Sequence, residues 1–125
     1  MCTITMTQPK PVFRRGSVVL VLFPNSDLRT AKSRPALVVQ ADGLRTGLPQ
    51  LIMAIITSRI SRGNHSSRVL VSLATPDGKK SGLLTDSVVM TDNLATVTES
   101  EIERAIGSLP MTTIDAALRH TLGLD

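Results

Sequence analysis

The sequence predicts an α+β fold, a small and strongly bent antiparallel sheet or barrel capped by helices. Short runs rich in Val, Ile and Leu follow one another between residues 17 and 97, separated by Gly, Pro and Asn. Near the C-terminus the apolar period changes to that of a helix. With 125 residues, 42% of them hydrophobic, the chain has room for one domain and enough apolar material for its core.

The first three strands are predicted from β-branched runs between turn residues. In Ser17–Phe23 both the odd and the even positions are apolar, so we expect a strand that is covered on both faces. Pro24–Ser33 is polar and rich in turn residues, which predicts a loop. Pro35 then opens a second strand, Ala36–Gln40, because proline is tolerated at the first position of a strand. Leu51–Thr57 is the third strand.

The middle of the chain reads as shorter elements. Arg59–Ser67 has no apolar period and predicts a loop, whereas Arg68–Leu73 alternates and predicts a fourth strand. Pro76–Gly78 has the residues of a turn. Asp92-Asn93 predicts a tight turn between two extended pieces. The short extended pieces expected here are 82–84, 87–90 and 94–97.

The C-terminal third is expected to mix helix and strand. Thr98 followed by Glu101 resembles a capping box and predicts a short helix through Ala105. Ile106–Leu109 is expected to be extended again.

A final helix is predicted next. Thr112 or Thr113 would cap its N-terminus, and Gly123 would end it. Its apolar stripe consists of Ile114, Ala117, Leu118, Thr121 and Leu122.

Charge is distributed unevenly along the chain. Residues 1–80 carry a net charge of +9 and residues 81–125 a net charge of −5, which together give the formal +4. A chain divided in this way can present one basic face, and such a face suits a polyanion or an acidic protein segment.

Composition excludes several classes of protein. Cys2 is the single cysteine, so an intramolecular disulfide framework is excluded, and the two histidines, His65 and His120, form no metal-ligand spacing. Phe13 and Phe23 are the only aromatic residues, which argues against folds that stack bases on aromatic rings. No apolar run is long enough to span a membrane and no signal peptide is recognised, so we expect a cytoplasmic protein without a membrane partner.

Ordered segments along nearly the whole chain, from about Arg14 to Leu124, resemble the MazF/PemK toxins. The segments that carry the resemblance are 15–21 (RGSVVLV), 24–28 (PNSDL), 34–39 (RPALVV), 55–58 (IITS), 81–83 (SGL), 86–89 (DSVV), 106–109 (IGSL) and 118–124. On this resemblance, residues 14–125 form the toxin domain and residues 1–13 an N-terminal tail.

The resemblance implies an SH3-like barrel with a C-terminal helix, assembled as a homodimer. It implies a toxin of a type II toxin–antitoxin system: an endoribonuclease that needs no metal or other cofactor and cuts single-stranded RNA, including mRNA, at short sequences. The implied partner is a small antitoxin, and a basic groove predicts an acidic, disordered inhibitory tail. The family's functional pair maps onto Arg34 and Thr57, with Ser58 adjacent.

The chemistry fits these residue types. RNA supplies its own nucleophile, the 2′-OH, so cleavage to a 2′,3′-cyclic phosphate requires alignment, removal of a proton and stabilisation of phosphoryl charge. The Arg34 guanidinium matches two phosphate oxygens but is a poor proton donor. Thr57 or Ser58 can hydrogen-bond the phosphate or the 2′-OH. The predicted RNA-binding residues are Asn25, Ser26, Arg29, Lys32, Arg59, Arg62 and His65.

Alternatives remain open at the level of sequence. The imidazole of His65 could accept the proton near neutral pH, or His65 could be an ordinary solvated loop residue. Arg34 could pair with Asp27 or cover apolar surface with its stem. A protein of the same architecture could instead be a CcdB-like poison of DNA gyrase, although the chain lacks the C-terminal Trp of that relative. A third reading is a catalytically silent module that binds RNA or antitoxin.

Overall fold

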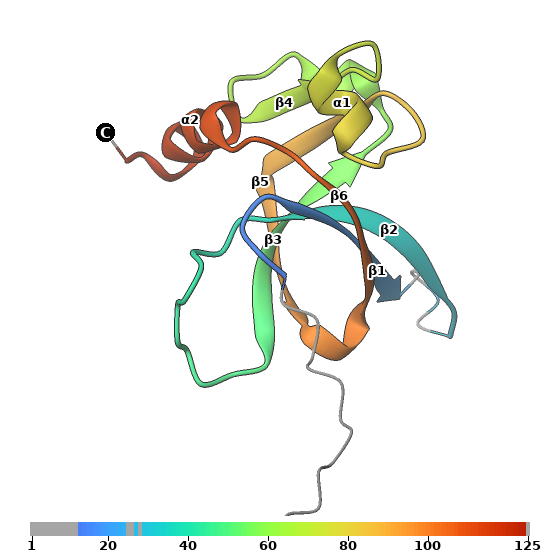
Figure 1. Cartoon of the computed structure of the whole chain (residues 1–125), viewed down its shortest axis with the longest axis vertical. Helices are drawn as coiled ribbons and strands as arrows, with labels where there is room; N and C mark the ends of the chain where they lie inside the picture. The colour runs from blue at the N-terminus through green and yellow to red at the C-terminus, as the bar shows by residue number, and fades with distance from the viewer. Residues whose placement is uncertain (1–12, 25–26, 28, 125) are drawn as a thin grey trace, which may run out of the picture.

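Six antiparallel strands form one bent sheet in the order β4-β5-β3-β2-β1-β6 (Figure 1). The structure is a computed structural model that describes residues 13–24, 27 and 29–124. The elements are β1 (Ser17–Pro24), β2 (Ala31–Val38), β3 (Gln50–Thr57), the 3₁₀ helix η1 (Ile60–Gly63), β4 (Arg68–Val71), α1 (Pro76–Lys80), β5 (Ser87–Thr98), the 3₁₀ helix η2 (Glu99–Glu101), β6 (Ile102–Ser108) and α2 (Thr112–Leu122).

The predicted α+β class is confirmed, with one difference in the sheet. Among the described strands β4 and β6 stand at the two ends and do not pair with each other, so the sheet is open rather than a closed barrel. The register between β3 and β5 shifts between Ala54 and Ile55. In Figure 1, β4, α1 and α2 lie at one end of the molecule and β1, β2 and the start of β6 at the other.

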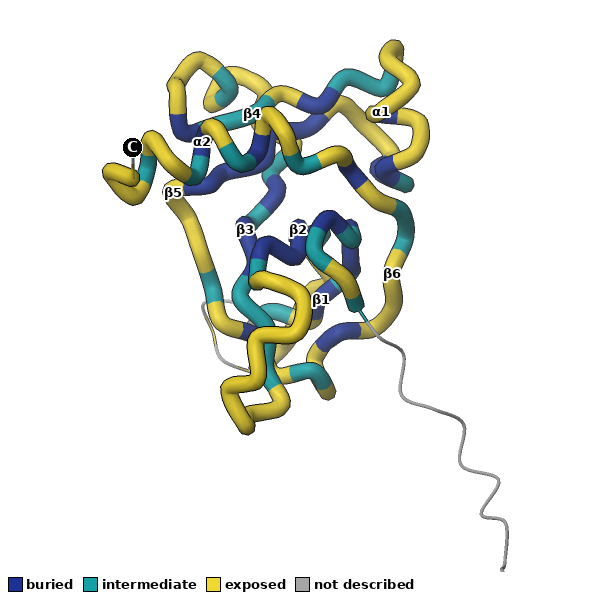
Figure 2. The backbone as a smooth tube through the Cα atoms, turned by 60° about the vertical axis from the view of Figure 1, so that its left-hand side comes forward, coloured by how far each residue is buried: buried dark blue, intermediate teal, exposed yellow. Residues whose placement is uncertain are grey.

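Apolar side chains form two buried clusters. Val18 and Val19 are both fully buried and belong to different clusters, which confirms that β1 is covered on both faces. Ile114 on α2 joins the cluster of Val18, so the C-terminal helix covers that face. Figure 2 shows the buried segments along the sheet and long exposed stretches in the loops. The groove described below opens beside this core.

Strand β2 begins five residues earlier than predicted. The segment Ala31–Pro35 pairs with β1 alone, and pairing with β3 begins only at Ala36. Pro35 therefore lies inside the strand, at a point where β2 still has a free edge and a missing N–H is tolerated. The predicted loop is shorter, because the β1–β2 hairpin extends beyond the core: residues 31–34 are exposed.

Several elements predicted for the second half of the chain differ from those in the structure. The expected pieces 87–90 and 94–97 form one strand, and the segment with Asp92-Asn93 is an irregularity within it. Residues 82–84 are not a strand. The Pro76 turn is the start of α1, where Thr75 Oγ1 accepts a hydrogen bond from Gly78 N. Proline fits this position because the first N–H of a helix has no partner within the helix.

The predicted helix through Ala105 is wrong. Thr98 makes no side-chain cap, η2 lasts three residues, and the chain then pairs with β1 as β6. The final helix is confirmed with its stop at Gly123, whose φ is 69°. Neither Thr112 nor Thr113 is its cap, because Met111 occupies the N-cap position without a side-chain hydrogen bond.

Candidate active-site groove

A groove of ≈ 610 Å³ opens where β2, the end of β3, η1, the segment after α1 and the middle of β6 meet. Its apolar lining includes Leu20, Ile55 and Ile106. In the sheet, β3 lies on one side of β2, and β1 with its neighbour β6 lies on the other side. Because the sheet is bent, the end of β3 and the middle of β6 line the same groove. Residues far apart in sequence are therefore brought to one hollow.

Six predicted site residues line this groove. Arg34 comes from the exposed part of β2, Thr57 ends β3, and Ser58 follows directly. The predicted RNA-binding residues on the same groove are Lys32, Arg59 and Arg62.

The Thr57 hydroxyl has a defined orientation. Arg59 N donates a hydrogen bond to Thr57 Oγ1 at 3.2 Å, and Thr57 is half-buried. Because this bond uses a lone pair, the hydroxyl proton of Thr57 remains available for an acceptor in the groove. A phosphate oxygen is an acceptor of this kind, and Thr57 can donate to it.

The groove contains cations without acids. Five cationic residues line it and no Asp or Glu does, and none of the five forms an ion pair within the described residues. The five are Lys32, Arg34, Arg59, Arg62 and Arg104. Uncompensated cations around one hollow raise its potential and attract anions.

Cations elsewhere on the surface do find carboxylates. Arg15 Nη2 lies 2.5 Å from Asp115 Oδ1, and Arg68 Nη2 lies 2.9 Å from Asp92 Oδ2. The hydrogen bond from Arg68 lowers the pKa of Asp92 below its ordinary value and raises that of Arg68. Two cations outside the groove thus have a carboxylate partner, whereas none of the five cations in the groove has one among the described residues.

Arg34 does not pair with Asp27, which was one reading of the sequence. Asp27 Oδ1 accepts hydrogen bonds from Arg29 N at 2.9 Å and Thr30 N at 3.2 Å. These backbone donors, that of Arg29 first, lower the pKa of the Asp27 carboxyl. Asp27 therefore shapes the β1–β2 turn and leaves Arg34 uncompensated.

Other predicted residues do not line the groove. Arg29 stays in the β1–β2 turn, and Asn25 and Ser26 lie outside the described residues. His65 lies beside α2, where its ring centroid is 6.2 Å from that of His120 and its Nδ1 accepts a hydrogen bond from Ser67 N at 3.0 Å.

Sequence reasoning missed five polar residues that line the groove: Ser33, Thr85, Ser87, Asn93 and Arg104. Arg104 comes from β6 and Asn93 from the irregularity in β5. Arg104 lies in the acidic half of the chain and was expected to be in a helix. Residues 102–106 show no alternation of apolar and polar residues, so the local sequence offers no strand signal that would have placed Arg104 at the groove.

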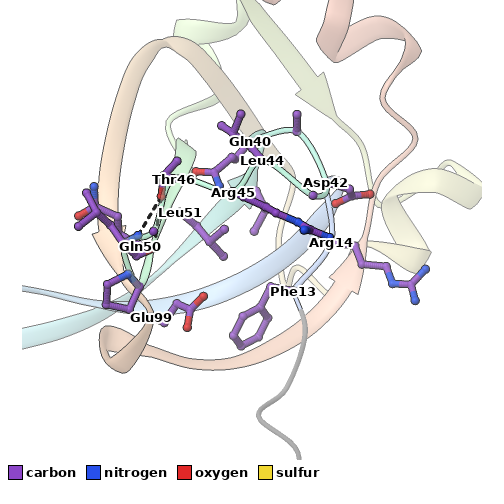
Figure 3. A pocket seen from close by; sticks show the side chains of 16 residues that line it. Phe13, Arg14, Gln40, Asp42, Leu44, Arg45, Thr46, Gln50, Leu51 and Glu99 are labelled. Carbon is purple, nitrogen blue, oxygen red and sulfur yellow. Dashed lines mark hydrogen bonds between the residues drawn. The ribbon is translucent and has the colours of Figure 1, made fainter.

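A second hollow of similar size differs in charge. It lies under the loop between β2 and β3 and has a volume of ≈ 600 Å³. In Figure 3, Phe13 and Glu99 lie on one side of it and Gln40 and Leu44 on the other. Its charged residues are mixed, with Asp42 and Glu99 beside two arginines. Because the hollows match in size, charge identifies the first as the candidate site for an anionic ligand.

Two features are absent from the described part of the chain. No three side chains of His, Cys, Asp or Glu gather as they would around a metal ion. No described helix has the length and apolar character needed to cross a membrane.

Fold and groove together define a class of small α+β proteins: a bent antiparallel sheet with a cation-lined groove and a C-terminal helix. Within this class, the chain belongs to the family of PemK-like, MazF-like toxins of type II toxin–antitoxin systems, whose family model matches residues 14–122.

Solved structures show the same fold. The Mycobacterium tuberculosis toxin MazF-mt6 superimposes with a TM-score of 0.67 at 24% identity, over 87% of this chain and 98% of that one. MazE–MazF from Deinococcus radiodurans gives 0.69 at 18% identity, over 93% and 100%. A mycobacterial endoribonuclease in complex with its cognate antitoxin gives 0.68 at 21% identity, over 91% and 98%.

Proposed function

We propose that this protein is an endoribonuclease toxin that cleaves single-stranded RNA by attack of the 2′-OH, leaving a 2′,3′-cyclic phosphate and requiring no metal. One observation carries the proposal: Arg34 and Thr57, from separate strands, line one groove whose five cations have no acidic partner. Family membership and the likeness to structures described as endoribonucleases support it.

The groove residues have distinct roles in this reaction. Arg34 binds the non-bridging oxygens of the scissile phosphate and stabilises the charge that builds there. Thr57, with its proton free, donates to the same phosphate, and Ser58 supplies a further hydroxyl beside it. Lys32, Arg59 and Arg62 bind neighbouring phosphates and hold the strand so that the 2′-OH stands in line with the leaving oxygen.

The test is cleavage of a long single-stranded RNA in EDTA. Wild type should give discrete fragments with 2′,3′-cyclic phosphate ends. Arg34→Ala should lower the rate about 10²- to 10³-fold, as expected when a donor to transition-state charge is removed. Arg34→Lys should also be impaired, because lysine lacks the bidentate fork. Intact RNA together with inhibited DNA supercoiling would favour a gyrase poison, and RNA bound but uncut would favour a silent module.

We also propose that an antitoxin with an acidic segment inhibits the enzyme by covering the groove. The uncompensated cations support this, since an acidic chain satisfies them as RNA does. Solved relatives include a complex described as containing a cognate antitoxin and a MazE–MazF assembly. The expected site of action is the cytoplasm, where mRNA is found.

A homodimer is a further part of the proposal. A hollow between α2, β5 and the β2–β3 loop is lined by Leu44, Leu94, Leu122 and Leu124, all of them exposed. Exposed apolar patches of this kind support a protein contact. Sedimentation equilibrium should give twice the chain mass, and Leu122→Glu should shift it to one chain.

A further inference from the structure

Strand β6 is irregular next to the groove. Along β1, Val21 pairs with Ile102 but Leu20 pairs with Arg104, so Glu103 has no partner residue on β1. Such a bulge bends a strand and redirects its side chains, and bulges are frequent beside active sites. Here Arg104 lines the groove, while Glu103 contacts β2.

The contact of Glu103 crosses β1. Ser33 Oγ donates a short hydrogen bond to Glu103 Oε1, although β1 lies between β2 and β6 in the sheet. Ser33 lines the groove and directly precedes Arg34. Among the hydrogen bonds of the described residues, this is the one that joins a carboxylate to a side chain lining the groove.

The proposed reaction lacks a proton acceptor for the 2′-OH. Arg34 stays cationic, and the hydroxyls of Thr57 and Ser58 are weak bases. His65, the acceptor considered from the sequence, does not line the groove, and its Nδ1 already accepts a hydrogen bond from Ser67 N.

We propose that Ser33 and Glu103 together form the proton acceptor of this site, an inference that rests on the proposed function. Ser33 Oγ takes the proton of the 2′-OH while its own proton passes to the Glu103 carboxylate. The geometry supports this direction, because Ser33 already donates to Glu103 and so offers its free lone pair to a group in the groove.

The bond from O2′ to phosphorus forms as the bond from phosphorus to O5′ breaks, and Arg34 stabilises the phosphoryl charge between them. Glu103 becomes a neutral acid. The departing 5′ oxygen takes a proton from water, and the proton held by Glu103 then neutralises the hydroxide that remains. The products are a 2′,3′-cyclic phosphate and a 5′-hydroxyl.

Apart from Glu103 itself, the charged side chains on β2, β1 and β6 around this contact are positive. Lys32 and Arg34 flank Ser33 on β2, Arg104 follows Glu103 on β6, and β1 contributes no titratable side chain between them. One carboxylate among these cations can take up a proton without repelling the RNA from the groove, because the net charge there stays positive.

The decisive variant is Glu103→Gln, whose amide oxygen can still accept the hydrogen bond from Ser33 but cannot take up its proton. The cleavage rate should fall about 10²- to 10⁴-fold, the usual contribution of a general base. Binding of 2′-O-methyl RNA, which lacks the nucleophile, should not weaken, since a negative charge has been removed.

Glu101→Gln is the matched control. It makes the same change of charge two residues away, in η2, at an exposed residue that does not line the groove. It should keep the cleavage rate of wild type. If Glu103→Gln cleaves RNA as fast as Glu101→Gln, the proposal is overturned.

Variants of Ser33 test the relay independently, in case Glu103→Gln is unstable. Ser33→Ala should lose cleavage as Glu103→Gln does, and Ser33→Thr, which restores a hydroxyl, should recover it. Full activity in Ser33→Ala would overturn the relay while leaving the endoribonuclease in place. If wild type leaves RNA uncut in EDTA and in Mg²⁺, the proposed function fails, and the relay fails with it.

Discussion

Arg104 shows most clearly how single residues build the groove. It comes from the acidic half of the chain, and it lines the groove without a carboxylate partner among the described residues. Its neighbour Glu103, which could have paired with it, is held by Ser33 instead. Arg104 therefore remains available to bind a phosphate in the groove.

We predict that Arg104→Gln weakens binding of 2′-O-methyl RNA and lowers the slope of log K against log salt by about 0.7, the value for one lost phosphate contact on a single strand. Fluorescence anisotropy across a salt series measures this slope. Lys79→Gln removes the same charge from an exposed position of α1 that does not line the groove, and it should leave the slope unchanged. Equal slopes for the two variants would place Arg104 outside the RNA path.

The residue-level site was only partly predictable from sequence. Arg34 and Thr57 were selected by the family resemblance, and both lie on the groove; their catalytic roles stay predictions. Arg104 and the contact between Ser33 and Glu103 could not be foreseen, because they depend on β6 returning beside β1 and on a bulge in that pairing. His65 was placed near Thr57 by sequence distance, but the chain turns through η1 and carries it to α2.

At the scale of elements, the segment after α1 is fixed against β6 by close backbone contacts. Gly82 has a φ of +76°, and a Cβ there would lie 2.0 Å from the carbonyl oxygen of Ile106. A Cβ on Gly107 would lie 2.3 Å from the carbonyl carbon of Ser81. Both glycines are needed for this approach, which holds β6 and the segment after α1 along one side of the groove.

Gly43 gives a matched comparison for Gly82. Its φ is +74°, but a Cβ there would meet nothing within 4 Å. We expect Gly43→Ala to cost about 1–2 kcal/mol of unfolding free energy, the penalty for a left-handed conformation. Gly82→Ala should cost about 1–3 kcal/mol more, because the backbone must also move. Urea unfolding measures both, and equal costs would show that the contact with Ile106 is easily relieved.

The ion pair between β4 and β5 should make stability depend on pH. Arg68 lowers the pKa of Asp92 in the folded state, so the pair stabilises the fold above the unfolded value of about 3.9. That stabilisation is lost as pH falls through the lower, folded value. Asp92→Asn should therefore be less stable than wild type at pH 7, and the difference should vanish in acid. Thermal unfolding between pH 2.5 and pH 7 measures it, and a constant difference would exclude the ion pair as its cause.

Elements were predictable where one signal dominated. The apolar run of β1 and the helical stripe of α2 specify their structures without help from distant residues. The sequence of residues 98–105 does not specify its structure in this way. Its pattern resembles a helix cap, but the chain pairs with β1 instead. Asp92-Asn93 suggested a hairpin, but β3 is long enough to pair with both halves of β5, so the chain continues across the irregularity.

For the whole molecule, the fold converts an uneven charge along the chain into a local field. The basic half of the sequence supplies four of the five groove cations, and β6 brings the fifth across from the acidic half. The family resemblance implied an SH3-like barrel, and the described sheet has this strong bend but stays open between β4 and β6. Whether the sheet closes depends on pairing between strands that are distant in the sequence, which local patterns do not specify.

If all five cations contact phosphates, the slope of log K against log salt for single-stranded RNA should approach a magnitude of about 3.5, at about 0.7 per contact. Raising salt fourfold would then weaken binding about 100-fold. Anisotropy with 2′-O-methyl RNA tests this, while thermal unfolding at the same salt concentrations should show that the protein stays folded. A slope near zero would mean that the cations of the groove do not meet the RNA backbone, and it would direct the search for the ligand to partners recognised by apolar contact.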